Sequence, residues 1–346
     1  MSAHASAPLR LSGPRRVGGL AGITRSPFVR LVARRLLAAI PVLWGVTFLT
    51  FLAMNALPGD AAQQLLGANA TPDQVHQLEV KLGLDEPLLT RYWHWFKGVV
   101  SGDLGHSLAS GQSVGHILGQ ALPITFELIA YAFVFSLLFA VPLALLSARK
   151  PNGILDRVTM LLSMGGLSIA NYVLALLLIW LFAVELGWLP ALGWVPPGQS
   201  IGQNLRYLTL PAVSIGLPLL CFYTRLLRAD LLEQLQGEDY VVTARAKGVG
   251  PWGVLTRHAL RNSVFGLITI VALNLGTLLG VTVIIEDIFS VPGMGRELLS
   301  AINTRDVPVV EGAVLVFATV VVAANFLADL LYSVLDPRIR YGGTRS

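Results

Sequence analysis

Charged side chains are scarce in this chain. Asp, Glu, Lys and Arg make up 13% of the 346 residues, whereas 54% are hydrophobic and the mean hydropathy is +0.66. Soluble domains usually carry about 25% charged residues. This shortage, together with apolar runs of about twenty residues or more, excludes an ordinary soluble domain and predicts an integral membrane protein.

Cysteine and lysine are also rare, and each shortage excludes a class of function. The single cysteine, Cys221, excludes an intrachain disulfide, and its apolar surroundings in sequence predict a small buried side chain. No lysine follows a glycine-rich turn, so a Gly-x-x-x-x-Gly-Lys-Ser/Thr phosphate-binding loop is missing. The four lysines are Lys81, Lys97, Lys150 and Lys247. We therefore expect the chain to bind no ATP itself.

Histidine is present but lacks the spacing of a metal or catalytic site. The six histidines form no His-Glu-x-x-His motif and no other paired ligand spacing. Four of them, His76, His94, His106 and His116, fall in one polar segment. A metal site there is one alternative, and ordinary surface histidines are the preferred one. With no arguable nucleophile–base pair either, we predict no catalytic residue, no metal and no cofactor in this chain.

Six stretches are long and apolar enough to cross roughly 30 Å of hydrocarbon as helices. They are residues 36–57, 122–146, 158–184, 207–227, 262–285 and 309–335. With no internal repeat and no low-complexity linker, the sequence predicts an all-α membrane protein with one transmembrane domain, residues 31–346.

Arginine and lysine are distributed unevenly between the two sides of these spans. If the N-terminus is inside, the inner segments hold 19 of the 25 basic residues and the outer segments hold six. Basic residues concentrate in cytoplasmic segments, so both termini are predicted to be cytoplasmic. Residues 1–30, rich in Ser, Ala, Gly, Pro and Arg, are predicted to be a disordered basic cytoplasmic tail. The first span is predicted to be retained, since residues 57–60 make a poor signal-peptide cleavage site.

The segment between the first two spans, residues 58–121, is predicted to be extracytoplasmic. Thr71 as N-cap, Pro72 in the first turn and Gln74 completing a capping box predict a helix that ends near Gly83. An amphipathic, aromatic-rich stretch follows at residues 91–96. The segment is too small for a generous core of its own, so we expect it to rest on the spans.

The segment between the fourth and fifth spans, residues 234–262, is polar and has a turn signal at its centre. Glu238 and Asp239 suit the start of a short helix. Gly248 and Gly250 permit a turn, and Pro251 suits the start of a second short helix, expected to end near residues 261–262. This pattern predicts a basic helix–turn–helix. It fits a docking surface for a partner and equally a solvated cytoplasmic loop; DNA binding is disfavoured because both ends are tethered to spans.

The residues of this segment resemble the EAA-type loop of ABC-transporter importer permeases, in its peptide/nickel form. The matching text is Asp239-Tyr240-x-x-Thr243-Ala244-Arg245-Ala246-Lys247-Gly248, followed by Arg257-His258-Ala259-Leu260-Arg261-Asn262. The general permease pattern has Glu and Pro where this chain has Val242 and Arg261. The resemblance implies that ATPase subunits couple to Asp239, Tyr240, Thr243, Ala244, Arg245, Lys247, Gly248, Arg257, His258 and Leu260.

Shorter motifs extend the resemblance over most of the chain, to the B-type permease of dipeptide and oligopeptide importers. They lie at residues 57–60, 82–85, 102–105, 186–190, 286–296 and 335–341. One departure is Ile169-Ala170-Asn171-Tyr172, where the family has Pro-Ser-Phe-Trp or similar.

The resemblance implies a permease subunit in a bacterial inner membrane, working in a larger assembly. A second, similar permease would complete a heterodimer in the bilayer, two ATPase subunits would bind ATP and Mg, and an extracytoplasmic solute-binding protein would deliver peptide. It implies no nucleic acid partner. Nickel or glutathione importers are alternatives for the cargo. Two alternatives come from other classes of protein: an ion-driven secondary transporter, and a membrane receptor or scaffold. The secondary transporter is disfavoured because no carboxylate lies at mid-span.

Polar residues inside spans are costly and usually face protein or water. Asn171, Asn274, Thr277 and Asn325 are therefore candidates for lining a translocation path, with interhelical hydrogen bonds as an equally good alternative. A second set concerns packing and span ends. Gly276 and Gly280 form a Gly-x-x-x-Gly pair that favours close helix packing. Glu286 and Asp287 are interpreted as marking the outer water interface, and attraction of a peptide amino terminus is the alternative.

Overall fold

The computed structural model describes residues 27–56, 63, 66 and 70–335. Most of the predicted tail, at residues 1–26, and the motifs at residues 57–60 and 336–341 lie outside the described residues. The chain divides into two units, residues 1–44 and residues 45–346. Helix α1 (Pro27–Ala56) contains the boundary between them. All the contacts described here lie within the second unit.

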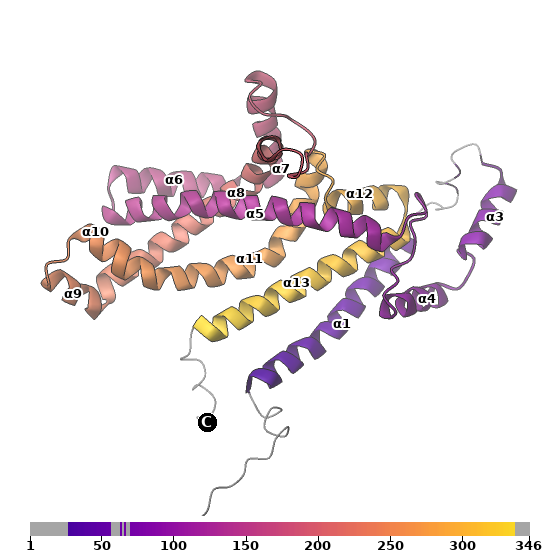
Figure 1. The fold of residues 1–346 in the computed structure, drawn as a ribbon, viewed down its shortest axis with the longest axis horizontal. Helices are drawn as coiled ribbons and strands as arrows, with labels where there is room; N and C mark the ends of the chain where they lie inside the picture. The colour runs from indigo at the N-terminus through magenta and orange to yellow at the C-terminus, as the bar shows by residue number, and fades with distance from the viewer. Residues whose placement is uncertain (1–26, 57–62, 64–65, 67–69, 336–346) are drawn as a thin grey trace, which may run out of the picture. The chain divides into compact units, whose positions relative to one another are not determined.

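Helices make up almost all of the described secondary structure, as Figure 1 shows, and this confirms the predicted all-α membrane fold. The described residues contain one isolated bridge, between His106 and Ser113, and no named strand. After α1 come α3 (Pro72–Leu82), α4 (Leu88–Val100), α5 (Val114–Arg149), α6 (Ile154–Ser168), α7 (Asn171–Leu178), the π-helical η2 (Ile179–Glu185), α8 (Ile201–Gly237), α9 (Asp239–Ala246), α10 (Pro251–Gly253), the π-helical η3 (Val254–Ala259), α11 (Leu260–Ile288), α12 (Met294–Thr304) and α13 (Val307–Leu335).

Five helical stretches among the described residues are long and apolar enough to span a membrane. They coincide with five of the six predicted spans. Three of them, at residues 114–149, 201–237 and 251–288, are longer than predicted, and the other two differ by a few residues at their ends. The third predicted span, residues 158–184, is instead a pair of helical segments, α6 and α7–η2, bent by 103° where they meet. The bend follows Ser168, where Ile169 and Ala170 adopt extended backbone conformations. Six spans are reached only if this bent pair counts as one.

The core of the second unit is centred on α5 and α8, which pack against each other. Alanines supply much of the buried surface of α5, and Gly216 of α8 lies so close to Ala132 that a Cβ there would be 2.8 Å from its carbonyl oxygen. Small residues let helix backbones approach closely in membrane proteins. Larger side chains of α8, including Tyr223 and Leu227, are fully buried among the neighbouring helices.

The segment between the first two spans contains the predicted capped helix and a second helix resting on α1. Thr71 Oγ1 accepts from the Gln74 amide and Gln74 Oε1 accepts from the Thr71 amide, so the capping box at the start of α3 is confirmed. Gly83 ends this helix in the left-handed conformation, with φ of 66°. In α4, the buried Tyr92 hydroxyl lies 3.0 Å from Thr47 Oγ1 of α1.

Candidate functional site

The predicted docking segment forms a hairpin of two helical arms, residues 238–261, which we call the 238–261 hairpin. Its first arm, α9, begins at Asp239 as predicted, and a glycine turn ends it. Gly248 has φ of 82° and donates to the Arg245 carbonyl, while Val249 donates to the Ala244 carbonyl. This pair of bonds is a Schellman motif, which needs a residue such as glycine in the left-handed conformation.

The two arms of the hairpin pack around a small apolar core of their own. Val241, Ala244 and Val254 are at most 5% exposed and form this core. Tyr240 and Val249 pack against it. A cluster of this kind fixes the angle between the arms, so the hairpin has a defined tertiary structure and is not an extended loop.

The second arm differs from the prediction at its far end. The sequence predicts a short helix from Pro251 that stops near residues 261–262. The structure instead runs from α10 through the π-helical η3 directly into α11, without a break up to Ile288. The expected stop is therefore wrong, because Arg261 and Asn262 are exposed positions of a continuing helix rather than a terminus. The hairpin and the fifth span thus share one helical rod.

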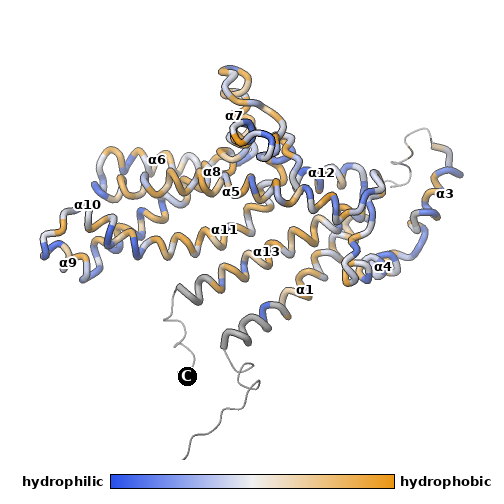
Figure 2. Tube along the Cα trace, viewed as in Figure 1, coloured by the Kyte–Doolittle hydropathy of each residue, from blue (hydrophilic) through white to orange (hydrophobic). Residues whose placement is uncertain are grey.

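The predicted coupling residues divide into an exposed set and a buried or half-buried set. Exposed are Asp239, Thr243, Arg245, Lys247, Gly248 and Arg257. The remaining four, Tyr240, Ala244, His258 and Leu260, are buried or half-buried. Tyr240 donates from its hydroxyl to Gln234 Oε1 at 2.5 Å, which ties α9 back to the end of α8. Figure 2 shows hydrophilic and hydrophobic residues mixed along α9, in contrast with the mostly apolar colouring along α11 and α13.

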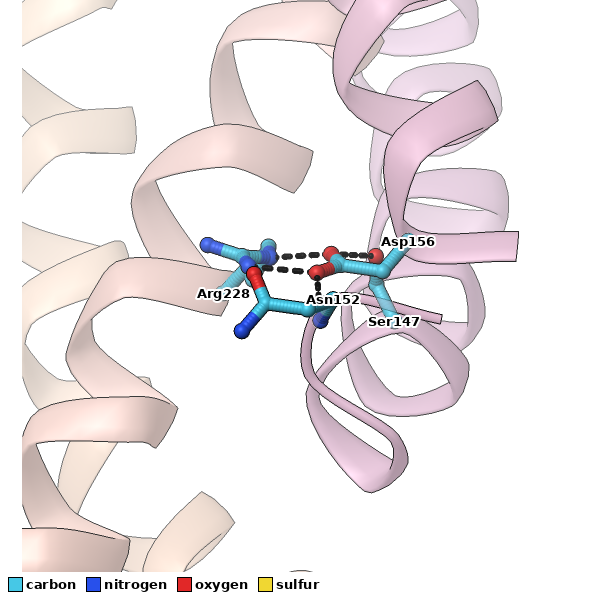
Figure 3. A network of polar contacts seen from close by, with 4 residues as sticks. All are labelled: Ser147, Asn152, Asp156 and Arg228. Carbon is cyan, nitrogen blue, oxygen red and sulfur yellow. Dashed lines mark hydrogen bonds and ion pairs between the residues drawn. The ribbon is translucent and has the colours of Figure 1, made fainter. Parts of the chain in front are cut away.

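Two charged contacts connect this end of the molecule to α5 and α6. The Arg149 guanidinium, at the end of α5, lies 5.6 Å from the ring centroid of Trp252 in α10. Near the start of α6, Asp156 receives two hydrogen bonds from Arg228 of α8, at 2.5 and 2.7 Å (Figure 3). These contacts join the hairpin and its supporting helix to the neighbouring α5–α6 turn.

The Asp156 carboxylate is saturated by its partners. Besides the bidentate bonds from Arg228, it accepts from the Ser147 hydroxyl at 2.7 Å and from the Asn152 amide at 2.8 Å (Figure 3). Asp156 is 3% exposed. Burying a carboxylate is costly unless it is paired and hydrogen-bonded, as it is here. Sequence reasoning missed this clamp, since 72 residues separate its charged partners and neither belongs to a motif.

The four candidate path residues have different surroundings. Asn274 of α11 is half-buried and donates to the Tyr223 hydroxyl of α8 at 3.2 Å, an interhelical hydrogen bond. Thr277 is exposed and bonds the carbonyl of Asn274 in its own helix. Asn325 of α13 is exposed, and Asn171 begins α7 directly after the 103° bend.

The two glycines of the Gly-x-x-x-Gly pair have different neighbours. A Cβ at Gly276 would lie 3.3 Å from Val321 Cγ1 and 3.8 Å from Asn325 Oδ1, so α11 and α13 approach closely there. At Gly280, no described atom outside its own helix turn lies within 4 Å of a Cβ position. Of this pair, only Gly276 therefore lies at a close helix contact among the described residues.

Glu286 does not mark the water interface, which corrects the prediction, whereas its neighbour Asp287 is exposed. Glu286 has no exposed surface, and its Oε2 accepts from the backbone amides of Gly295 and Arg296 at 2.7 and 3.3 Å. The carboxylate thus caps the N-terminus of α12. A side chain at Gly293 or Gly295 would collide with it. The closely spaced glycines after Glu286 were the sequence signal of this cap.

Together, the helices long and apolar enough to cross a membrane and the absence of a named strand among the described residues define an all-α, multi-span membrane protein. Residues 140–341 match the family described as binding-protein-dependent transport system inner membrane component, and residues 28–129 match its N-terminal part. The chain belongs to this family. It is therefore the membrane component of an ABC transporter, which works with ATPase and binding-protein partners.

Named relatives align with almost the whole chain. The dipeptide transport system permease protein DppB of Alkalihalophilus pseudofirmus is 39% identical over 328 residues, covering 89% of this chain and 98% of that protein. The glutathione transport system permease protein GsiC of Pectobacterium atrosepticum is 37% identical, with coverages of 89% and 98%. GsiC of Escherichia coli is 34% identical, with coverages of 90% and 98%.

Proposed function

We propose that this chain is one permease subunit of an ATP-driven peptide importer, and that ATPase subunits grip it at the 238–261 hairpin. The observation that carries this proposal is the construction of the hairpin. It has its own apolar core, a fixed glycine turn and exposed Arg245, Lys247 and Arg257. This surface is rigid and cationic, and it is continuous with a membrane-spanning helix. A movement of a partner bound to it would therefore be passed on to that helix.

The proposed cycle follows from these connections. Closure of the ATPases on ATP would move the hairpin as a rigid body, with α11 attached to its second arm and α8 to its first. The Asp156–Arg228 clamp would carry the same displacement to α6. Alternation between inward- and outward-facing states would then expose a path between this subunit and a second, similar permease. Asn171, Asn274, Thr277 and Asn325 are proposed to line it.

The remaining roles belong to other subunits. ATP and Mg would be bound by the ATPases, so this chain is proposed not to be an enzyme. The binding protein would deliver cargo from the extracytoplasmic side, with both termini and the hairpin in the cytoplasm. Orientation is testable with single cysteines, because Cys221 is buried and can be replaced by serine. Lys247→Cys should react with a membrane-impermeant maleimide only in inside-out vesicles; reaction from the outside would overturn the orientation.

The docking role is tested by charge reversal. In proteoliposomes containing the whole transporter, Arg245→Glu with Lys247→Glu should abolish ATP-dependent uptake, while the permease still inserts. Lys150→Glu with Arg157→Glu is the matched control, since both residues are exposed near the α5–α6 turn but lie outside the hairpin. Normal uptake and normal ATPase co-purification by the hairpin double variant would contradict the proposal.

Peptide is the preferred cargo because relatives with that function align over nearly the whole chain. Glutathione is a second candidate, because permeases named for it match at 34–37% identity. A competition assay separates the two. Uptake of a labelled dipeptide should be suppressed by unlabelled dipeptides in excess and little affected by glutathione; the reverse pattern would assign glutathione.

A further inference from the structure

A cavity near the start of α13 is lined by a buried carboxylate, one oxygen of which has no hydrogen-bond partner among the described residues. Glu311 is 2% exposed, and its Oε1 has no hydrogen-bond partner among the described residues. The other two buried carboxylates at this end of the second unit accept hydrogen bonds from backbone amides, although Glu286 Oε1 also has no partner among the described residues. Glu286 caps α12, and Asp306 accepts from the Ser107 hydroxyl and from the backbone amides of Leu108 and Ala109.

Glu311 lines a cavity of about 260 Å³ together with residues of α1 and α4. A second buried polar atom without a partner belongs to the same cavity wall, the indole Nε1 of Trp95. One is a hydrogen-bond acceptor and the other a donor. Buried polar groups without partners are costly, so the cavity is suited to a ligand that supplies both a donor and an acceptor.

The charges around the cavity favour a cationic group. Glu86 and Glu311 contribute two carboxylates and Arg91 contributes one guanidinium. That guanidinium already donates to Asn55 Oδ1 at 3.2 Å and lies over the Phe51 ring. Burial lowers the pKa of Arg91, an effect that the two carboxylates partly offset. Aromatic walls from Phe51 and Trp95 also suit a cation.

A bare metal ion fits the cavity poorly. No group of three or more His, Cys, Asp or Glu residues in the described parts of the chain is arranged to hold one. The volume lies just below the range of about 300–1,000 Å³ that is typical of pockets for drug-sized ligands. An amino acid or a very short peptide is therefore of suitable size.

We propose that this cavity binds a primary ammonium group bearing a neighbouring oxygen acceptor, as at the amino terminus of an amino acid or short peptide. The ammonium donates to Glu311, and the neighbouring carbonyl or carboxylate oxygen accepts from Trp95 Nε1. The site is separate from the hairpin and from the candidate path residues. It does not depend on which cargo the transporter carries.

Direct binding to the full-length chain in lipid nanodiscs, without nucleotide, tests this site. The probes are alanine, dialanine and N-acetyl-dialanine, and the binding of each is measured by isothermal titration calorimetry. Dialanine or alanine should bind, and N-acetyl-dialanine should bind at least about tenfold more weakly, because acetylation removes the charge that pairs with Glu311. Tighter binding of dialanine assigns peptides as the ligand, and equal binding assigns the amino-terminal group alone.

Two variants locate the bound ligand. Glu311→Gln keeps the shape and an acceptor but removes the charge, and should weaken binding about tenfold; Trp95→Phe removes only the donor and should weaken it less. Glu185→Gln, an exposed carboxylate in η2, is the matched control and should leave binding unchanged. Absence of binding by both free-amine probes, or equal binding of the acetylated probe to the unaltered protein, would overturn the proposal. So would unweakened binding to a folded Glu311→Gln variant.

Discussion

Carboxylates are buried at both ends of the second unit, and the groups that donate hydrogen bonds to them differ between the two ends. At the hairpin end, Asp156 is paired with Arg228 in a bidentate salt bridge. At the other end, Glu286 and Asp306 are held by backbone amides, with a serine hydroxyl added for Asp306 and no arginine or lysine within salt-bridge distance among the described residues. Figure 1 shows α9 and α10 at one end of this unit and α12 at the other.

The difference concerns what each carboxylate joins. The Asp156–Arg228 pair connects two helices through side chains alone, so it holds α6 against α8 while each helix keeps its own backbone bonds. The Glu286 carboxylate instead completes the backbone bonding of α12, a short helix that packs against α11 and α5. The first arrangement ties two helices to each other; the second sets where a helix begins. Substitutions at Asp156 and Glu286 test this contrast directly, and substitutions at Gly248 and Asn274 then test the hairpin turn and the region between the two ends.

Breaking the salt bridge is expected to have the largest effect. Asp156→Ala leaves the half-buried Arg228 guanidinium, whose side chain is 19% exposed, without its carboxylate partner. Breaking a fully buried pair typically costs about 3–5 kcal/mol, so we expect a loss up to the lower end of that range. The melting temperature of the detergent-solubilised transporter should fall substantially, and uptake should be lost. Arg157→Ala, at the exposed neighbouring position, is the control and should melt almost normally. An unchanged melting temperature for Asp156→Ala would show that the clamp contributes little to holding α6 and α8 together.

Removing the helix cap should cost less. Glu286→Ala leaves the amides of Gly295 and Arg296 without their acceptor, a penalty of about 1–3 kcal/mol for an unsatisfied buried group. We expect faster hydrogen exchange at the start of α12 while the hairpin end keeps its protection. Asp287→Ala alters the adjacent, exposed carboxylate and serves as the control. Equal exchange in both variants would contradict the capping role.

The hairpin turn tests whether coupling depends on its shape. Gly248→Ala places a side chain at φ of 82°, which costs roughly 1–2 kcal/mol in the left-handed region. Uptake should fall more than membrane insertion does, and Gly248→Pro should abolish uptake because proline cannot adopt a positive φ. Gly250→Ala, at φ of −65° with open space around it, should be nearly neutral. Full transport by Gly248→Pro would remove the turn from the coupling mechanism.

The smallest effect is expected between the two ends, at the Asn274–Tyr223 hydrogen bond. Interhelical bonds of this kind contribute about 0.6 kcal/mol on average in membrane proteins. Asn274→Leu should therefore alter the uptake rate with little loss of stability and without releasing the ATPases. Thr269→Val, which removes a bond within the same helix, is the control. An uptake profile identical to the unaltered protein would take Asn274 off the path.

The sequence predicted what depends on local pattern. Hydropathy located the spans, and the order Thr71-Pro72-x-Gln74 located a capped helix, because a capping box involves residues only three positions apart. The turn at Gly248 and the start of α9 were predicted for the same reason. The coupling and path assignments themselves stay predictions.

What the sequence could not predict depends on direction or on distant partners. The mean hydropathy of residues 158–184 carries no information on the direction of the helix axis. It therefore could not predict the 103° bend after Ser168. The Asp156–Arg228 pair and the Glu311 cavity bring together residues from several helices. Glu286 was misread because a carboxylate near a span end has the same local pattern whether it faces water or caps another helix.

The glycine turn of the hairpin has a consequence for how a partner is received. Its hydrogen bonds run between Ala244, Arg245, Gly248 and Val249, so the surface is preorganised before any ATPase arrives. A partner binding there need not order a flexible segment. The free energy of binding is therefore not reduced by the entropy cost of such ordering. Association should then show the modest heat-capacity change of rigid docking rather than that of coupled folding.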